Sequence, residues 1–89
     1  MEFEYDPGKS ESNRRKHGVD FEEAQALWLD PHAVTAKVWE EPEERWALFA
    51  VMGGKHWTAI YTVRGGRVRI ISVRRSRGRE EELYEGRKG

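Results

Sequence analysis

The chain has 89 residues, of which 37% are hydrophobic and 36% are charged, so it can form one domain with a small core and a highly charged surface. It has no cysteine and no apolar run near the roughly 20 residues of a membrane helix, which excludes a disulfide scaffold, a thiolate metal site and a membrane-spanning helix. The acidic start of the chain lacks the apolar stretch of a secretory signal, so we expect an intracellular, cytoplasmic protein.

The first third of the chain predicts one short strand and two helices. Aromatic and acidic residues alternate over 3–5, which is typical of a strand. A polar helix is expected over 7–16, because an Asp-Pro pair precedes it and Gly18 follows it. Asp20 begins a capping-box pattern, and apolar residues then recur at helical spacing, so a second helix is expected over 20–30.

After residue 30 the pattern changes to that of strands. Four segments rich in β-branched and aromatic residues are expected to be strands, at 33–39, 45–52, 56–63 and 68–74. Turns that contain proline or Gly-Gly separate them. The segment 68–74 is the most apolar and is expected to be a central strand. A final helix is expected over 79–85. The order β-α-α-β-β-β-β-α predicts a single α+β domain with an antiparallel sheet and helices packed on one face.

The formal net charge of zero conceals two oppositely charged halves. Residues 1–44 carry 5 basic and 12 acidic residues, whereas residues 45–89 carry 11 basic and 4 acidic residues. The segment 64–79 contains no acidic residue and no lysine but seven arginines, at positions 64, 67, 69, 74, 75, 77 and 79. Because the guanidinium fork suits phosphate and carboxylate, we expect an exposed cradle for a phosphate backbone or an acidic protein. The alternative is a solvated face whose arginines are neutralised by acidic residues elsewhere in the fold.

Conventional catalytic motifs are missing from the sequence. The three histidines are not at metal-ligand spacing, and neither a phosphate-binding P-loop nor a Gly-x-Ser-x-Gly motif is present, so we expect no metal and no cofactor. The remaining cluster of cations is compatible with metal-independent RNA cleavage, in which a ribose 2′-hydroxyl attacks the adjacent phosphate. Fixed cations offset the charge that accumulates on the phosphate oxygens, and removing one such donor typically costs about 10²–10³ in rate.

Three further side chains are candidates for proton transfer. His17 follows a cationic run at the end of the first helix, and Glu80 and Tyr84 are one helical turn apart on the last helix. Each also has a structural interpretation. His17 suits a helix C-terminus, Glu80 can pair with an arginine of the sheet, and Tyr84 can pack the last helix onto the domain.

Strand alternation raises a difficulty for a site that uses both Arg69 and Arg74. In a regular strand Arg69 lies on the same face as Ile71 and Val73, while Arg74 lies on the opposite face with Ser72. The two guanidinium groups are therefore not expected to converge unless a bulge or the end of the strand redirects one of them.

Two separated motifs stand out in the sequence. The first is Asn13 with the segment 16–24, Lys-His-Gly-Val-Asp-Phe-Glu-Glu-Ala, and the second is the segment 69–74, Arg-Ile-Ile-Ser-Val-Arg, followed by Glu80 and Tyr84. Together these motifs resemble those of the BrnT toxins. The resemblance implies a RelE-like fold and a ribonuclease that arrests translation. It also implies a BrnA-like antitoxin with a ribbon-helix-helix domain, whose complex with the toxin binds promoter DNA.

The resemblance also implies which residues act. It assigns catalysis to Lys16, His17, Arg69, Arg74, Glu80 and Tyr84. Contacts with RNA or the partner are expected from Arg64, Arg67, Arg75, Arg77 and Arg79. A non-catalytic arginine-rich module that holds an acidic protein or a nucleic acid is the main alternative. A DNA-binding regulator is the third, although the basic residues concentrate in a strand and no recognition helix is evident.

Overall fold

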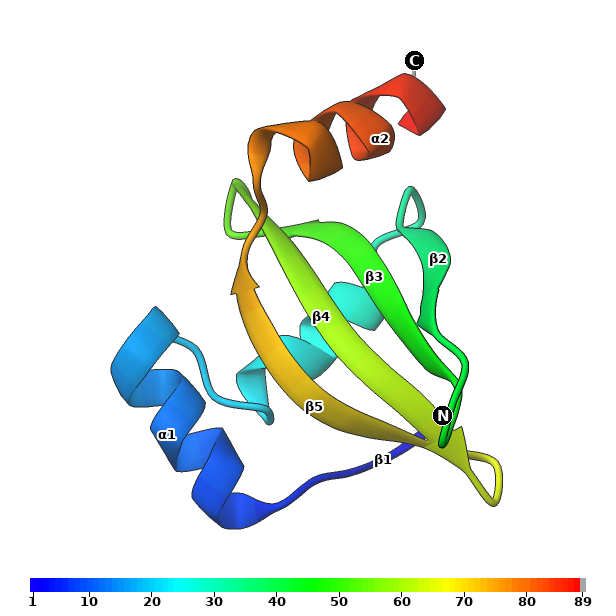
Figure 1. The fold of residues 1–89 in the computed structure, drawn as a ribbon. Helices are drawn as coiled ribbons and strands as arrows, with labels where there is room; N and C mark the ends of the chain where they lie inside the picture. Colours follow the sequence, from blue (N-terminus) through cyan, green and yellow to red (C-terminus); the bar gives the residue numbers. More distant parts are fainter. Residues whose placement is uncertain (89) are drawn as a thin grey trace.

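The computed structural model describes residues 1–88, and their side chains as far as residue 86. The predicted α+β class and the element order are confirmed (Figure 1). The elements are β1 (Glu2–Glu4), α1 (Pro7–His17), the 3₁₀ helix η1 (Glu23–Leu29), β2 (Val34–Trp39), β3 (Arg45–Met52), β4 (Lys55–Arg64), β5 (Arg67–Arg75) and α2 (Gly78–Lys88). None of the described helices is long and apolar enough to cross a lipid bilayer.

The five strands form one mixed sheet in the order β1-β5-β4-β3-β2. Strands β2 to β5 are antiparallel to their neighbours, as expected, but β1 runs parallel to β5. The register of β1 has a simple physical reason. Phe3 packs against the core, at 5.2 Å from the ring of Trp28, while Glu2 and Glu4 point to the other face and meet Arg67 and Arg69. Strand β5, which contains residues 68–74, is an interior strand between β1 and β4, although β1 pairs only with its first three residues, 67–69.

Local capping interactions explain the two ends of α1 and the turn that leads into η1, which begins at Glu23 and not at Asp20 as expected. The Asp6 carboxylate accepts a hydrogen bond of 2.9 Å from the backbone N–H of Gly8. Gly18 ends α1 with φ of 81°, a left-handed conformation that glycine adopts without strain. Asp20 and Glu23 form the predicted capping box, in which each carboxylate accepts from the backbone N–H of the other residue at 2.8 and 3.0 Å.

The main core lies between η1 and one face of the sheet (Figure 1). Phe21, Ala24 and Leu27 are fully buried there. They pack against strand residues that include Leu48, Ala59, Ile70 and Val73. Burial of this apolar surface supplies most of the favourable free energy of folding in a domain of this size.

The helices do not all pack on one face, which corrects the sequence-based expectation. Helix α2 lies on the face opposite η1, where Tyr84 packs with Ala47 and Phe49 in a second, smaller cluster. Successive residues of β3 point to opposite faces, and both sets are apolar, so each face needs a cover. Helix α1 lies along β5 (Figure 1). The sheet is therefore covered by η1 on one face and by α2 at one end of the other.

Candidate active site

A β-bulge in β5 brings the predicted arginines to one face of the sheet. In the pairing of β4 with β5, Ile60 lies opposite Ser72 and Tyr61 lies opposite Ile70, so Ile71 is an extra residue. The alternation therefore resets at Ile71. Arg69 and Arg74 share the face that carries α2, and the expectation that they point to opposite faces is wrong.

Most of these arginines are neutralised by carboxylates rather than free for a ligand. Four ion pairs join the predicted cations to acidic residues: Arg64–Glu43 at 3.1 Å, Arg67–Glu2 at 2.9 Å, Arg69–Glu4 at 3.2 Å and Arg74–Glu80 at 2.8 Å. The expected continuous arginine cradle is therefore wrong, and the alternative of neutralisation holds for these four residues. Three of the four carboxylates, those of Glu2, Glu4 and Glu43, come from the N-terminal half of the chain.

The other three predicted arginines have no ion pair with a carboxylate among the described residues. Arg75 lies over the ring of Trp57, with its guanidinium carbon 5.6 Å from the ring centroid. Arg77 and Arg79 are exposed near the start of α2. These two side chains are the members of the arginine run with the freest access to an external anion.

The Arg74–Glu80 pair joins the end of β5 to the first turn of α2. Two hydrogen bonds of 2.8 Å connect the guanidinium to both carboxylate oxygens, and the two side chains are only 24% and 17% exposed. Glu80 also accepts from the Thr58 hydroxyl and from the backbone N–H of Arg77. These interactions lower the pKa of Glu80 to about 2, and the hydrogen bonding with Arg74 is the largest cause. A carboxylate held this strongly in its charged form is a poor proton acceptor at neutral pH.

Tyr84 is also buried in the interior of the protein. Its side chain is 3% exposed, and its hydroxyl donates a 2.7 Å hydrogen bond to Asp30. Burial, with the Asp30 carboxylate as the next cause, raises the pKa of Tyr84 to about 12. Asp30 also accepts from the backbone N–H groups of His32 and Val51. The geometry therefore matches the packing interpretation of Tyr84, because its hydroxyl joins α2 to the loop after η1.

Lys16 and His17 lie in a different place, on the last turn of α1 beside β5. The side chain of Asn13 holds this helix against the strand edge. Its amide donates to the carbonyls of Val19 and Val73 at 2.8 and 2.9 Å and accepts from the Val73 N–H at 3.1 Å. Asn13 thus pairs with Val73 as a neighbouring strand would. It is 6% exposed, so the attachment is shielded from water.

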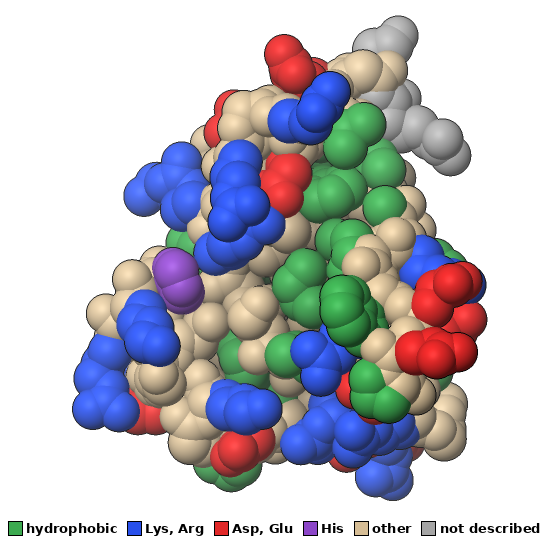
Figure 2. Space-filling view, viewed as in Figure 1, with side chains coloured by type: hydrophobic (Ala, Val, Ile, Leu, Met, Phe, Trp, Pro, Cys, Tyr) green, Lys and Arg blue, Asp and Glu red, His purple; other side chains and the backbone are tan. Residues whose placement is uncertain are grey.

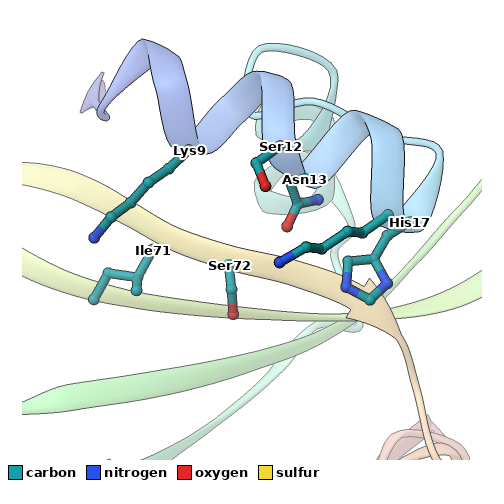
Figure 3. Close-up of a pocket in the computed structure, with 7 residues that line it drawn as sticks. Lys9, Ser12, Asn13, His17, Ile71 and Ser72 are labelled. Carbon is teal, nitrogen blue, oxygen red and sulfur yellow. The ribbon is translucent and has the colours of Figure 1, made fainter.

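A cleft of about 200 Å³ opens between α1 and β5 (Figure 3). The residues that line it are Lys9, Ser12, Asn13, Lys16, His17, Ile71 and Ser72. None of them is acidic, and within the described part of the chain neither lysine has a carboxylate at ion-pairing distance. Ammonium groups, an imidazole and hydroxyls are the kinds of group that can bind a phosphate-like anion. Figure 2 shows several Lys and Arg side chains on this side of the molecule and a further group at its lower edge.

The structure therefore divides the predicted residues among three places. Lys16 and His17 share the cleft, Arg74, Glu80 and Tyr84 anchor α2, and Arg69 pairs with β1. Within the described residues no group of three or more His, Asp or Glu is arranged to hold a metal ion.

The sequence-based prediction missed Lys9, Ser12 and Ser72 in the cleft. Helical periodicity contained a signal for two of them, because residues 9, 12 and 16 recur at the spacing of one helix face. Ser72 carried no such signal, since its place depends on the bulge.

Comparison with known proteins places the chain in a family. The family described as "Ribonuclease toxin, BrnT, of type II toxin-antitoxin system" matches residues 5–80, which include Asn13, the α1 residues of the cleft and all of β5 but not Tyr84. No curated protein matches the chain. The chain belongs to the BrnT family, the ribonuclease toxins of type II toxin–antitoxin systems.

Proposed function

We propose that this protein is a metal-independent endoribonuclease that blocks translation by cutting RNA in the cleft between α1 and β5. The observation that carries the proposal is the grouping of Lys9, Lys16 and His17 around a space whose lining contains no carboxylate. Such a site binds a phosphate of the RNA backbone and stabilises the negative charge that develops on it.

The reaction assigned to the cleft is internal transesterification of RNA. The 2′-oxygen attacks the adjacent phosphorus, the O2′–P bond forms and the P–O5′ bond breaks. His17 takes the proton of the 2′-hydroxyl, and the Lys16 ammonium donates a proton to the leaving O5′. The products are a 2′,3′-cyclic phosphate and a 5′-hydroxyl, and Lys9 remains charged beside the phosphate throughout.

The other predicted residues have supporting tasks in this proposal. Arg77 and Arg79, which have no carboxylate partner among the described residues, contact the phosphate backbone beyond the cleft. Arg64, Arg67 and Arg69 remain in their ion pairs and contribute little net charge, whereas Arg75 adds positive potential beside the ring of Trp57. Arg74, Glu80 and Tyr84 keep α2 in place, so their effect on cleavage is indirect.

We further propose that a BrnA-like ribbon-helix-helix antitoxin neutralises the toxin in the cytoplasm. The antitoxin delivers carboxylates to the cationic side of the molecule and thereby excludes RNA. Promoter DNA is bound only through the toxin–antitoxin complex, in which the ribbon-helix-helix domain of the antitoxin supplies the DNA contacts.

Cleavage of a defined RNA by the purified toxin tests the proposal. Wild-type protein should cut RNA equally well with and without EDTA and leave cyclic phosphate ends. Lys16→Ala and His17→Ala should each lower the rate by about 10²–10³. Arg15→Ala is the matched control, because Arg15 precedes Lys16 on α1 but does not line the cleft, and its rate should stay within about twofold of wild type.

Three outcomes would contradict the proposal. Loss of activity in EDTA would show that a metal ion takes part. Full activity of the Lys16→Ala and His17→Ala proteins would exclude the cleft as the catalytic site. RNA that is bound but never cut by the wild-type protein would favour the alternative function, a non-catalytic module that holds nucleic acid or an acidic partner.

A further inference from the structure

The sheet face that carries α2 is covered only at one end. Ala47, Phe49 and Tyr84 are buried in the cluster beneath the helix. Farther along the same face, the apolar side chains of Ala36 and Ile60 are only half-buried. Figure 2 shows hydrophobic side chains as a band across this face, next to the Lys and Arg side chains.

Strand register aligns part of this band into a row that leads to the cleft. Ala36 lies opposite Ala47, Ala47 lies opposite Ile60, and Ile60 lies opposite Ser72, so these four residues cross β2, β3, β4 and β5 side by side. We call them the cross-strand row. Ser72, its last member, also lines the cleft with Lys9 and Lys16. The row is thus apolar over three strands, with Ala36 and Ile60 partly exposed on either side of the buried Ala47. It ends beside Lys9 and Lys16, which have no carboxylate partner among the described residues.

We propose that the cross-strand row is the docking surface for the antitoxin, a proposal that rests on the proposed function. The occupant is an amphipathic segment with apolar residues over β2, β3 and β4 and with carboxylates at the end that reaches β5. Its apolar part gains from burying the half-exposed side chains of Ala36 and Ile60. Its carboxylates pair with the cations of the cleft.

The chemistry along the row favours a protein segment over RNA. An RNA strand needs free cations along its whole path, since most of its affinity comes from phosphate contacts. The arginines that border the row on β5, Arg69 and Arg74, are already paired with Glu4 and Glu80. Small aliphatic side chains therefore form most of the path, and the free charge is confined to the end at the cleft.

Docking in this manner also explains how the antitoxin would inhibit cleavage. A segment that starts on β2 and ends at Ser72 places its acidic end where the RNA phosphate would bind. Affinity then comes from the apolar row, which RNA does not use. The antitoxin can accordingly displace RNA without competing for every one of its contacts.

Substitutions on opposite faces of β4 test this surface. Ile60→Glu places a carboxylate in the row, whereas Val63→Glu, three residues along the same strand, places one on the opposite face at a side chain that is 55% exposed. Ala36→Glu is a second variant on the edge strand β2, where a change in folding is least expected. The probe is the purified cognate antitoxin, and the readouts are its Kd by calorimetry and the RNA cleavage rate of the free toxin.

Ile60→Glu and Ala36→Glu should each weaken antitoxin binding by about 100-fold or more, because a charge is buried against apolar side chains. RNA cleavage by both variants and antitoxin binding by Val63→Glu should stay within about twofold of wild type. Unchanged antitoxin binding by the folded Ala36→Glu protein would overturn the docking surface. Loss of cleavage with normal antitoxin binding would assign the row to RNA instead. If the wild-type toxin cuts no RNA but the binding pattern holds, the proposed catalysis fails and the docking surface stands.

Discussion

At the scale of single residues, the ability of a cationic side chain to bind a phosphate depends on whether a carboxylate of the protein already pairs with it. Arg74 and Lys16 are both cations in segments predicted to carry the site. Arg74 meets Glu80 in a bidentate pair that excludes most solvent, whereas Lys16 has no such partner among the described residues. A paired guanidinium can bind phosphate only after its own ion pair breaks. The free lysine meets no such cost, so the proposed catalysis rests on the cleft.

The first prediction concerns Glu80, whose pKa is held at about 2 chiefly by Arg74. Because this pKa is below the ordinary value of 4.5, the carboxylate stabilises the fold above pH 4.5, and this contribution is lost as the pH falls towards 2. Glu80→Gln should therefore lower the free energy of unfolding at pH 7 by about 1–3 kcal/mol. The difference from wild type should shrink in acid. Urea unfolding at both pH values measures it.

Glu82→Gln serves as the control for this prediction. Glu82 is exposed on the same helix, and it forms no ion pair with another described residue. The control should unfold like wild type at both pH values. A Glu80→Gln difference that is absent at pH 7, or is as large in acid as at pH 7, would show that the Arg74–Glu80 pair does not contribute to stability in this way.

At the scale of secondary-structure elements, polar side chains position the helices as much as apolar packing does. Helix α1 buries only Ser10 and Asn13, so its place beside β5 depends on hydrogen bonds. Ser10 accepts from the backbone N–H of Phe21, and Asn13 bonds both backbone groups of Val73. The cleft exists because these bonds hold a polar helix next to a strand edge that β1 leaves uncovered beyond Arg69.

A second prediction follows for Asn13. Asn13→Ala leaves the buried N–H and carbonyl of Val73 without their partner, which should lower the free energy of unfolding by about 1–3 kcal/mol. Amide hydrogen exchange at Val73 should become faster, and RNA cleavage should fall because Lys16 and His17 lose their fixed position. The Arg15→Ala protein, altered on the exposed side of the same helix, should show none of these changes. Wild-type exchange at Val73 in the Asn13→Ala protein would contradict this account of how α1 is held.

At the scale of the whole molecule, the two oppositely charged halves of the chain neutralise each other across the sheet. Acidic residues of β1 and of the turn before β3 pair with arginines of β4 and β5, over sequence separations of up to 65 residues. The cations left over are concentrated around α1 and the start of α2. A protein with zero net charge therefore still presents one positive side to a partner.

The third prediction uses this remaining positive side. Assembly of the toxin with its antitoxin should be faster at low salt, because attraction between exposed charges is screened as the Debye length falls from about 30 Å at 0.01 M to about 3 Å at 1 M. Stopped-flow association rates across this range measure the effect. Lys9→Gln combined with Lys16→Gln should make the rate less dependent on salt. An association rate that is the same at all ionic strengths would exclude electrostatic steering.

The sequence by itself determined the order of elements, the ends of α1 at Asp6 and Gly18, the Asp20–Glu23 capping box, the four long strands and the location of the cations along the chain. These features depend on neighbouring residues, through periodicity, capping and turn chemistry. Only the tertiary structure decided the direction of β1, the faces that the helices cover and the partner of each arginine. Those depend on contacts such as Arg69–Glu4 and on one extra residue at Ile71, which redirects every side chain after it. No local pattern contains such information, because the energies that select it arise between residues that are distant in the chain and meet only when it folds.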